Sequence, residues 1–295
     1  MSFQGTYTAI ITPFCEGKID TESFRKHIEK QVAGGVTGIV PVGTTGESPT
    51  VDMAEHIEII RLAVEFAAGR CEVLAGTGAN ATAEAIELTQ AAEKAGATGT
   101  LQVCPYYNKP SQEGLYQHFK MIAANTNLPV MLYSVPGRSG IEIGVETTAR
   151  LATDCANIKG IKEAGGSVER VNQLVEAVPA GFSILSGDDP LTLPFMVCGA
   201  VGLVSVASNI IPEVMSGLVK LCLAGDFVAA AELHKKYYPL LRGLMSMEVN
   251  PVPIKTAAHL LGYCGPEFRL PLVPLSEAKI TTLKALLEEF QVARA

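Results

Sequence analysis

Eight short apolar segments recur along the chain, and the intervals between them carry the pattern of amphipathic helices. The apolar segments span residues 7–12, 37–42, 72–76, 99–104, 129–133, 158–162, 182–186 and 202–206. Helical patterns lie between them, for example at 21–33, 53–68, 82–95 and 111–125. Strands that alternate with helices form a parallel sheet, and eight such units close into a barrel. The sequence therefore predicts an α/β fold, a (β/α)8 or TIM barrel.

The main alternative is an open, doubly wound sheet, whose nucleotide-binding signature G-x-G-x-x-G does not follow the first strand here. After Leu223 the pattern becomes purely helical, at 226–244, 253–261 and 276–293, with prolines between these segments. We therefore predict a catalytic barrel over residues 1–224 and a C-terminal helical extension over residues 225–295.

Charge and composition argue against several classes of partner. The 23 basic and 30 acidic residues give a net charge of −7, which disfavours nucleic acid and anionic membranes as partners. The uncharged stretch 190–212 contains glycine, serine and asparagine, so it fits a buried strand with its loops better than a membrane span. The first residues show no signal-peptide pattern, and we expect a cytoplasmic protein.

The cysteines and histidines predict no metal site. The seven cysteines contain no C-x-x-C pair, and the five histidines contain no H-x-x-x-H pair. This spacing indicates neither a disulfide framework nor a zinc site.

Lys162 ends the sixth apolar segment and is followed by Glu163-Ala164-Gly165-Gly166. Side chains alternate along a strand, so Lys162 should share a face with Ile158 and Gly160. If that face lines a barrel, loss of solvation favours the neutral amine, which a Schiff-base nucleophile requires. A lysine at a strand end is more often a surface residue, so the assignment depends on the other strand ends.

In a barrel of this type the reacting groups lie where the strands end. Glycine-rich turns present backbone amides to anions, tyrosines carry protons, and arginine binds carboxylates. Each motif alone is weak, because tight turns and packed tyrosines are common, but together with Lys162 they predict an aldolase-type site. The motifs are Gly43-Thr44-Thr45-Gly46-Glu47, Gly76-Thr77-Gly78-Ala79-Asn80, Tyr106-Tyr107-Asn108-Lys109-Pro110, Tyr133-Ser134-Val135-Pro136-Gly137-Arg138-Ser139-Gly140 and Ser186-Gly187-Asp188-Asp189.

Four of these motifs, all except Gly76-Thr77-Gly78-Ala79-Asn80, together with Gly160-Ile161-Lys162-Glu163-Ala164, occur in the order found in the pyruvate-dependent class I aldolases. The whole chain resembles this family, which includes dihydrodipicolinate synthases and N-acetylneuraminate lyase. The resemblance implies that Lys162 forms a covalent imine with pyruvate, without any cofactor. It implies that Tyr133 is the acid/base group and that Thr44 and Tyr107 complete a proton relay. Tyr107 is expected to reach a partner's site, in a homo-oligomer that is a tetramer built from dimers.

The resemblance also implies how the substrates are held. Thr44 and Thr45 would hold the pyruvate carboxylate through backbone groups, and Arg138 would bind the carboxylate of L-aspartate 4-semialdehyde. Gly187 and Val204 would border the lysine through backbone groups. The implied product is 4-hydroxy-tetrahydrodipicolinate, in the diaminopimelate route to lysine.

Two residues depart from the family pattern. Ser134 stands where asparagine is common, and Lys159 replaces a more usual apolar residue and should face the helices. Neither departure removes a reacting group.

Two other functions remain open at this point. A related pyruvate aldolase would act on a sugar acid such as N-acetylneuraminate or a 2-keto-3-deoxy acid, and Arg138 argues against it. A non-enzymatic binding protein on an aldolase barrel would have lost the lysine or the tyrosines, and all are present.

The resemblance further implies a regulatory site for L-lysine in the cleft between paired subunits. Its residues would be Ser48, His56, Asn80, Glu84 and Tyr106. Met53 replaces a histidine found in some inhibited members, which points to weaker affinity. Without the resemblance, His56 and Glu84 would read as exposed polar residues of a helix.

Overall fold

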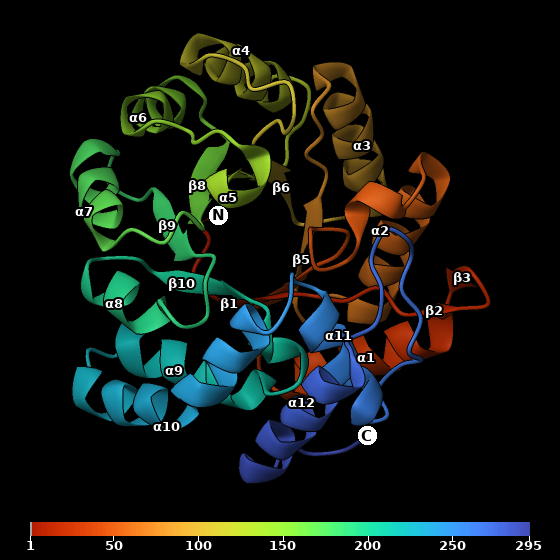
Figure 1. Cartoon of the computed structure of the whole chain (residues 1–295). Coiled ribbons are helices and arrows are strands. Elements are labelled where there is room, and N and C mark those ends of the chain that lie inside the picture. The colour runs from red at the N-terminus through yellow and green to blue at the C-terminus, as the bar shows by residue number, and fades with distance from the viewer. Residues whose placement is uncertain (1) are drawn as a thin grey trace.

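The eight apolar segments form eight parallel strands, which close into a barrel in the computed structural model (Figure 1). The structure describes residues 2–295. The predicted barrel is confirmed, and the strand ends lie within a few residues of the predicted ones. The barrel strands, in order around the barrel, are β1 (Gly5–Ala9), β4 (Gly38–Val40), β5 (Glu72–Gly76), β6 (Gly99–Val103), β7 (Val130–Ser134), β8 (Ile158–Glu163), β9 (Ser183–Ser186) and β10 (Gly202–Ser205).

Helices surround the barrel, and several begin where the sequence offers a capping side chain. The carboxylates of Asp20 and Asp52 and the hydroxyl of Ser111 each accept a hydrogen bond from the amide three residues later. A small antiparallel hairpin, β2 (Phe14–Cys15) and β3 (Lys18–Ile19), follows β1. The helices up to residue 223 are α1 (Thr21–Ala33), η1 (Ser48–Thr50), α2 (Met53–Ala67), α3 (Thr82–Ala95), α4 (Gln112–Ala123), α5 (Pro136–Ser139), α6 (Val145–Asp154), α7 (Val168–Ala177), α8 (Thr192–Val197), η2 (Ala207–Asn209) and α9 (Pro212–Leu223).

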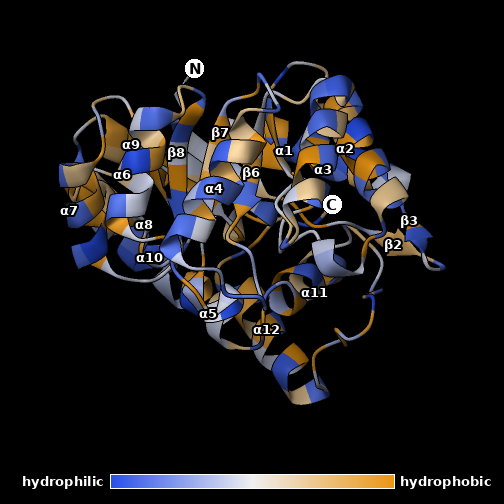
Figure 2. Ribbon diagram, turned by 90° about the horizontal axis from the view of Figure 1, so that it is seen from above, coloured by the Kyte–Doolittle hydropathy of each residue, from blue (hydrophilic) through white to orange (hydrophobic). Residues whose placement is uncertain are grey.

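The C-terminal segment is helical, as the sequence predicts. It contains α10 (Phe227–Ser246), α11 (Val252–Leu260) and α12 (Glu277–Glu289). In the view from above, the N-terminus lies at one end of the molecule, while α5, α11 and α12 lie towards the other end (Figure 2). Among residues 2–295, no helix has the length and apolar character needed to cross a bilayer.

Apolar side chains fill the inside of the barrel and an outer region, formed by two separate clusters, between the barrel and its helices. Inside lie Tyr7, Leu74, Leu101, Met131, Tyr133, Leu185 and Val204. The outer region includes Val130, Leu132 and Ile161, packed among residues of the helices. Strand residues of alternating position therefore point to opposite sides, as the pleat of a strand requires.

The prediction that Ile158 shares a face with Lys162 is wrong. Ile158 belongs to the same outer region as Ile161. The pairing of β7 with β8 shifts there, since Val130 pairs with Ile158 but Met131 pairs with Gly160. The extra residue is Lys159, which is half-buried and lines a surface depression beside Ala152 of α6. A bulge of one residue reverses the alternation, so only Gly160 keeps the predicted side.

Asp189, the last residue of the Ser186-Gly187-Asp188-Asp189 motif, is a buried carboxylate that links the end of β9 to the end of β10. It accepts hydrogen bonds from the Ser205 hydroxyl at 2.5 Å and from the amides of Val206 and Ala207 at 2.9 and 3.0 Å. Burial raises the pKa of the Asp189 carboxyl from 3.8 to about 6, against the opposing effect of these donors.

This shift predicts how Asp189 affects stability with pH. Between about pH 4 and 6 the folded protein keeps a proton that the unfolded chain has lost. The contribution of Asp189 to the unfolding free energy is therefore greatest below about pH 4 and falls as pH rises through 6. We expect the unfolding free energy of the wild type, minus that of Asp189→Asn, to fall by about 2–3 kcal/mol between pH 4 and 7. Urea denaturation of both proteins at each pH measures this difference in unfolding free energy. A difference that grows with pH would contradict the raised pKa of Asp189.

Candidate active site

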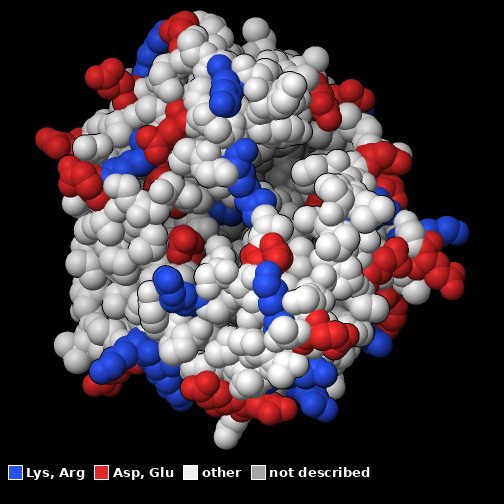
Figure 3. Space-filling view, viewed as in Figure 1, with Lys and Arg blue, Asp and Glu red and all other residues white. Residues whose placement is uncertain are grey.

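A cavity of about 230 Å³ opens at the carboxyl ends of the barrel strands. Figure 3 shows a hollow near the centre of this face, with basic side chains inside it and beside it. The cavity wall combines glycine backbone with a few polar groups and apolar side chains, as small-molecule sites commonly do. The lining residues are Val42, Gly43, Thr44, Ser48, Pro49, Gly76, Gly78, Leu101, Val103, Tyr106, Tyr133, Val135, Arg138 and Ser139.

Lys162 and Tyr133 lie side by side because β7 and β8 pair in that register. The Lys162 Nζ atom is 4.1 Å from the centroid of the Tyr133 ring, and both residues are only 5–6% exposed. Tyr133 forms part of the cavity wall, whereas Lys162 does not, so the amine lies next to the wall at the phenol ring. Leu185, the residue paired with Lys162 on β9, adds an apolar neighbour inside the barrel.

Gly187 leaves room for the lysine. A Cβ atom at Gly187 would lie 3.0 Å from Lys162 Cε and 2.7 Å from Ala164 Cβ, so any larger residue would displace the lysine side chain. Val204 lies buried in the barrel interior with Tyr133. The structure thus places Gly187 beside Lys162 and Val204 in the same interior.

The Thr44–Thr45 turn presents unused backbone amides. Its shape comes from bonds donated by the amides of Gly46 and Ser48 to Gly43 O and by the Glu47 amide to Thr44 O. Within residues 2–295 no acceptor pairs with the amides of Thr44 and Thr45. Successive free amides of this kind suit an anion. Thr44 lines the cavity, while Thr45 is buried and its hydroxyl accepts a hydrogen bond from Asn250 Nδ2 at 3.0 Å.

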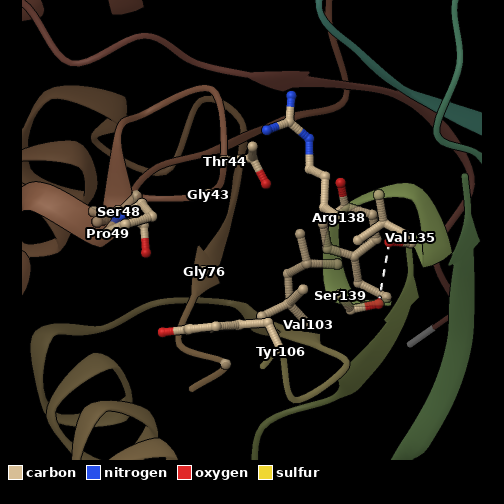
Figure 4. A pocket seen from close by; sticks show the side chains of 14 residues that line it. Gly43, Thr44, Ser48, Pro49, Gly76, Val103, Tyr106, Val135, Arg138 and Ser139 are labelled. Atoms are coloured by element: carbon tan, nitrogen blue, oxygen red, sulfur yellow. Dashed lines mark hydrogen bonds between the residues drawn. The ribbon is translucent and has the colours of Figure 1, made fainter. Parts of the chain in front are cut away.

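Arg138 comes from the short helix α5 that follows β7, and its side chain extends toward Thr44 (Figure 4). Arg138 is exposed, and its Nη2 group donates a hydrogen bond to Asn250 O at 2.8 Å. The neighbouring Ser134, one of the departures from the family pattern, is buried and accepts a weak bond from the Ile143 amide at 3.4 Å. A guanidinium at the cavity mouth can bind a carboxylate there.

Tyr107 is the predicted residue that the single chain does not bring to the site. Its side chain is 90% exposed, and its backbone has a positive φ of 71°. It does not line the cavity that contains Tyr133. The adjacent Tyr106 does line it, which shows that the two tyrosines of the loop have different surroundings.

A second, smaller cavity of about 100 Å³ adjoins the first and brings together four of the five predicted regulatory residues, Ser48, His56, Glu84 and Tyr106. The fifth, Asn80, contacts Tyr106 O through its Nδ2 atom at 3.4 Å. His56 is buried and donates from Nε2 to Gly76 O at 2.7 Å, and burial lowers its pKa. Reading His56 as an exposed helix residue is therefore wrong, whereas Glu84 is exposed.

Sequence reasoning missed the residues from the C-terminal segment that reach the cavity mouth. Asn250 contacts both Thr45 and Arg138, and Lys255 forms a buried ion pair with Glu47. No local pattern around Asn250 or Lys255 indicates these contacts, because their partners lie more than 100 residues away. Glu47 belongs to a motif that the sequence singles out, but the motif does not reveal its partner.

No cluster of three or more histidine, cysteine, aspartate or glutamate side chains arranged to hold a metal occurs in the described part of the chain. Cys104, Cys155, Cys222 and Cys264 are buried, as expected for cysteines that pack as small apolar residues.

The fold and the site define a barrel enzyme of the lysine-dependent aldolase class. Residues 2–290 match the model of the dihydrodipicolinate synthetase family. The chain is 48% identical to the 4-hydroxy-tetrahydrodipicolinate synthase of Persephonella marina over 99% of its length and 100% of that protein. It superposes with a TM-score of 0.97 on the 4-hydroxy-tetrahydrodipicolinate synthase of Methylacidiphilum fumariolicum, at 55% identity, covering 98% of this chain and 96% of the other. The chain belongs to the dihydrodipicolinate synthetase family.

Two further solved relatives contain small molecules. The chloride-inhibited dihydrodipicolinate synthase of Acinetobacter baumannii is complexed with pyruvate (TM-score 0.96, 43% identity, 99% of this chain and 100% of the other). The enzyme of Cyanidioschyzon merolae has lysine bound (TM-score 0.93, 38% identity, 97% of each chain).

Proposed function

We propose that this chain condenses pyruvate with L-aspartate 4-semialdehyde to give 4-hydroxy-tetrahydrodipicolinate, the compound for which its full-length relatives are named. The observation that carries this proposal is the buried amine of Lys162 against the Tyr133 ring, next to a cavity at the barrel mouth. Such an amine has the position that a Schiff-base nucleophile needs.

The reaction follows from the chemistry of an imine. The Lys162 amine adds to the pyruvate carbonyl, water leaves, and the resulting iminium draws electrons from the methyl group. The methyl group then loses a proton and becomes an enamine, whose carbon attacks the aldehyde. The amino group of the second substrate replaces Lys162 at the imine carbon, which closes the ring and frees the lysine. One molecule of water is lost overall, and no cofactor takes part.

The side chains around the cavity take the following roles in this proposal. Tyr133 moves protons to and from the reacting carbons, because its ring lies beside the amine. The free amides of Thr44 and Thr45 hold the pyruvate carboxylate, while Gly187 and Val204 border the lysine. Arg138, at the mouth, binds the carboxylate of the semialdehyde.

Tyr107 takes part from a neighbouring subunit in this proposal. Its 90% exposure in the single chain suits a side chain that is covered by a partner. It would complete the proton relay with Thr44 and Tyr133 in the partner's site, so the active unit is at least a dimer. We propose a tetramer built from two such dimers.

The first test of the function is reductive trapping. With pyruvate and borohydride, mass spectrometry should locate the adduct on Lys162, and Lys162→Ala and Lys162→Arg should nearly abolish turnover. Arginine keeps the charge but supplies no neutral amine. Lys159→Ala, on the same strand, is the matched control and should still be trapped. An adduct on another lysine, or a fully active Lys162 variant, rules out the mechanism.

A mixture of two inactive or weakened variants tests whether Tyr107 acts in the active site of the partner subunit. Tyr107→Phe subunits mixed with Lys162→Ala subunits should regain activity that neither has alone, since some sites then hold both intact residues. Verified hybrids without any gain would count against the role of Tyr107 across the interface.

Arg138→Ala should separate the two substrates. We expect the KM for aspartate semialdehyde to rise about ten- to a hundred-fold, because a charge-assisted hydrogen bond of about 1.5–3 kcal/mol is lost. Pyruvate trapping at Lys162 should persist. Arg150→Ala, an exposed arginine on α6 paired with Glu113, serves as the control. Wild-type protein that ignores the semialdehyde and cleaves N-acetylneuraminate or a 2-keto-3-deoxy acid would overturn the choice of substrate.

We propose that the smaller cavity binds L-lysine as an effector. In support, it gathers Ser48, His56, Glu84 and Tyr106, and a relative has been solved with lysine bound. The Glu84 carboxylate would meet an ammonium group, and Asn80 and Tyr106 would hold the effector carboxylate. Tyr106 also lines the larger cavity, so an effector that moves its side chain would change the shape of the cavity at the proposed active site.

Glu84→Gln should weaken the inhibition of the enzyme by L-lysine that we expect from binding in the smaller cavity. The variant keeps the shape of the side chain but loses its charge, so the lysine concentration for half-inhibition should rise about ten-fold. Steady-state rates over a lysine titration measure the effect. Glu87→Gln, three residues further along α3, is the control. Equal inhibition of Glu84→Gln and wild type would place the effector elsewhere.

A further inference from the structure

A buried ion pair joins the Thr44–Thr45 turn to the C-terminal helix α11. Lys255 Nζ lies 2.5 Å from Glu47 Oε1, and both side chains are fully buried. The two residues are 208 positions apart in the chain. Burial lowers the pKa of the Lys255 ammonium, and the Glu47 carboxylate opposes that shift. Each charge compensates the other in a region without solvent, so neither can be removed alone at low cost.

The surroundings hold this pair in one place. Lys255 Nζ lies 4.3 Å from the centroid of the Phe14 ring and 5.1 Å from that of Phe268. The second oxygen of Glu47 accepts a hydrogen bond from the Arg269 amide at 3.1 Å. The Arg269 guanidinium in turn donates to Glu55 of α2 and to Thr50 O. Glu47 is therefore attached to two separate parts of the C-terminal segment.

The backbone explains why the turn needs such an attachment. Glu47 has a φ of 61°, in the left-handed region that residues other than glycine adopt at a cost. Val42, just before the turn, has a φ of 52°. A strained turn keeps its shape only if surrounding contacts hold it, and the buried carboxylate of Glu47 supplies such contacts.

The same C-terminal segment touches two substrate-binding groups of the proposed site. Asn250, five residues before Lys255, donates to the Thr45 hydroxyl and accepts from Arg138. The segment from Asn250 to Lys255 thus contacts the turn at two points and the arginine at a third. It belongs to the helical extension that we propose for residues 225–295.

We infer that Glu47 and Lys255 are positioning residues, which hold the Thr44–Thr45 turn so that its two free amides face the carboxylate of bound pyruvate. The inference rests on the proposed function. It assigns a catalytic purpose to the C-terminal extension, whose residues do not themselves react. Loss of the pair should weaken the binding of pyruvate rather than the chemistry at Lys162.

The test uses the full-length double variant Glu47→Gln/Lys255→Met, which removes both charges and leaves no unpaired one. The readout is the pyruvate concentration that gives half-maximal borohydride trapping at Lys162, together with the KM for pyruvate and kcat. We expect both concentrations to rise at least about ten-fold while kcat changes less than about three-fold, because uniform binding of pyruvate is lost.

Tyr7→Phe controls for a general loss of stability. Tyr7 is buried in the barrel, and its hydroxyl donates to Glu72 Oε2 at 2.6 Å, at the start of β5. This variant should lower the unfolding temperature without changing the pyruvate concentration for trapping. A double variant that is less stable but traps pyruvate at the wild-type concentration overturns the inference. Wild-type protein that forms no adduct on Lys162 contradicts the proposed function instead.

If the double variant does not fold, Glu47→Asp tests whether the Glu47–Lys255 pair positions the turn for pyruvate. It keeps both charges but withdraws the carboxylate by one methylene, so the turn must move or the contact must break. The pyruvate concentration for half-maximal trapping should rise at least three-fold. A folded Glu47→Asp protein with the wild-type value would show that the pair serves stability alone.

Discussion

The register between β7 and β8 is the constraint on which the site depends. It pairs Tyr133 with Lys162 after a bulge at Lys159, and it places the phenol ring 4.1 Å from the amine. A shift of β8 by one residue against β7 would turn the Lys162 side chain toward the helices and away from Tyr133. The closed barrel prevents that shift, because each strand is held by neighbours on both sides and the outer apolar residues, such as Leu132 and Ile161, are packed under helices.

The mouth of the barrel is assembled from segments that lie far apart in the chain. The turn after β4 supplies amides, the loop after β7 supplies Arg138, and the C-terminal segment supplies Asn250 and Lys255, which contact these parts. Lys162, the nucleophile that we propose, lies on a barrel strand, whereas the proposed binding groups lie on turns that need support. The helical extension is therefore a structural part of the site and not an appendage of the barrel.

The two cavities share part of their walls. Ser48, Pro49, Gly78 and Tyr106 line both of them. A ligand in the smaller cavity would contact side chains that also shape the larger one, which gives coupling a short physical path.

The sequence by itself determined the fold class, since eight apolar segments and the helical patterns between them set the strands and helices to within a few residues. It also predicted the chemical groups that we propose for the site, because strand ends are visible in a sequence. Only the tertiary structure decided the rest. The bulge that moves Ile158 to the outer side, the exposure of Tyr107, the burial of His56 and the Glu47–Lys255 pair left no local signal. Alternation and periodicity report on neighbours in the chain, whereas these features arise from contacts between residues that meet only when the barrel has closed.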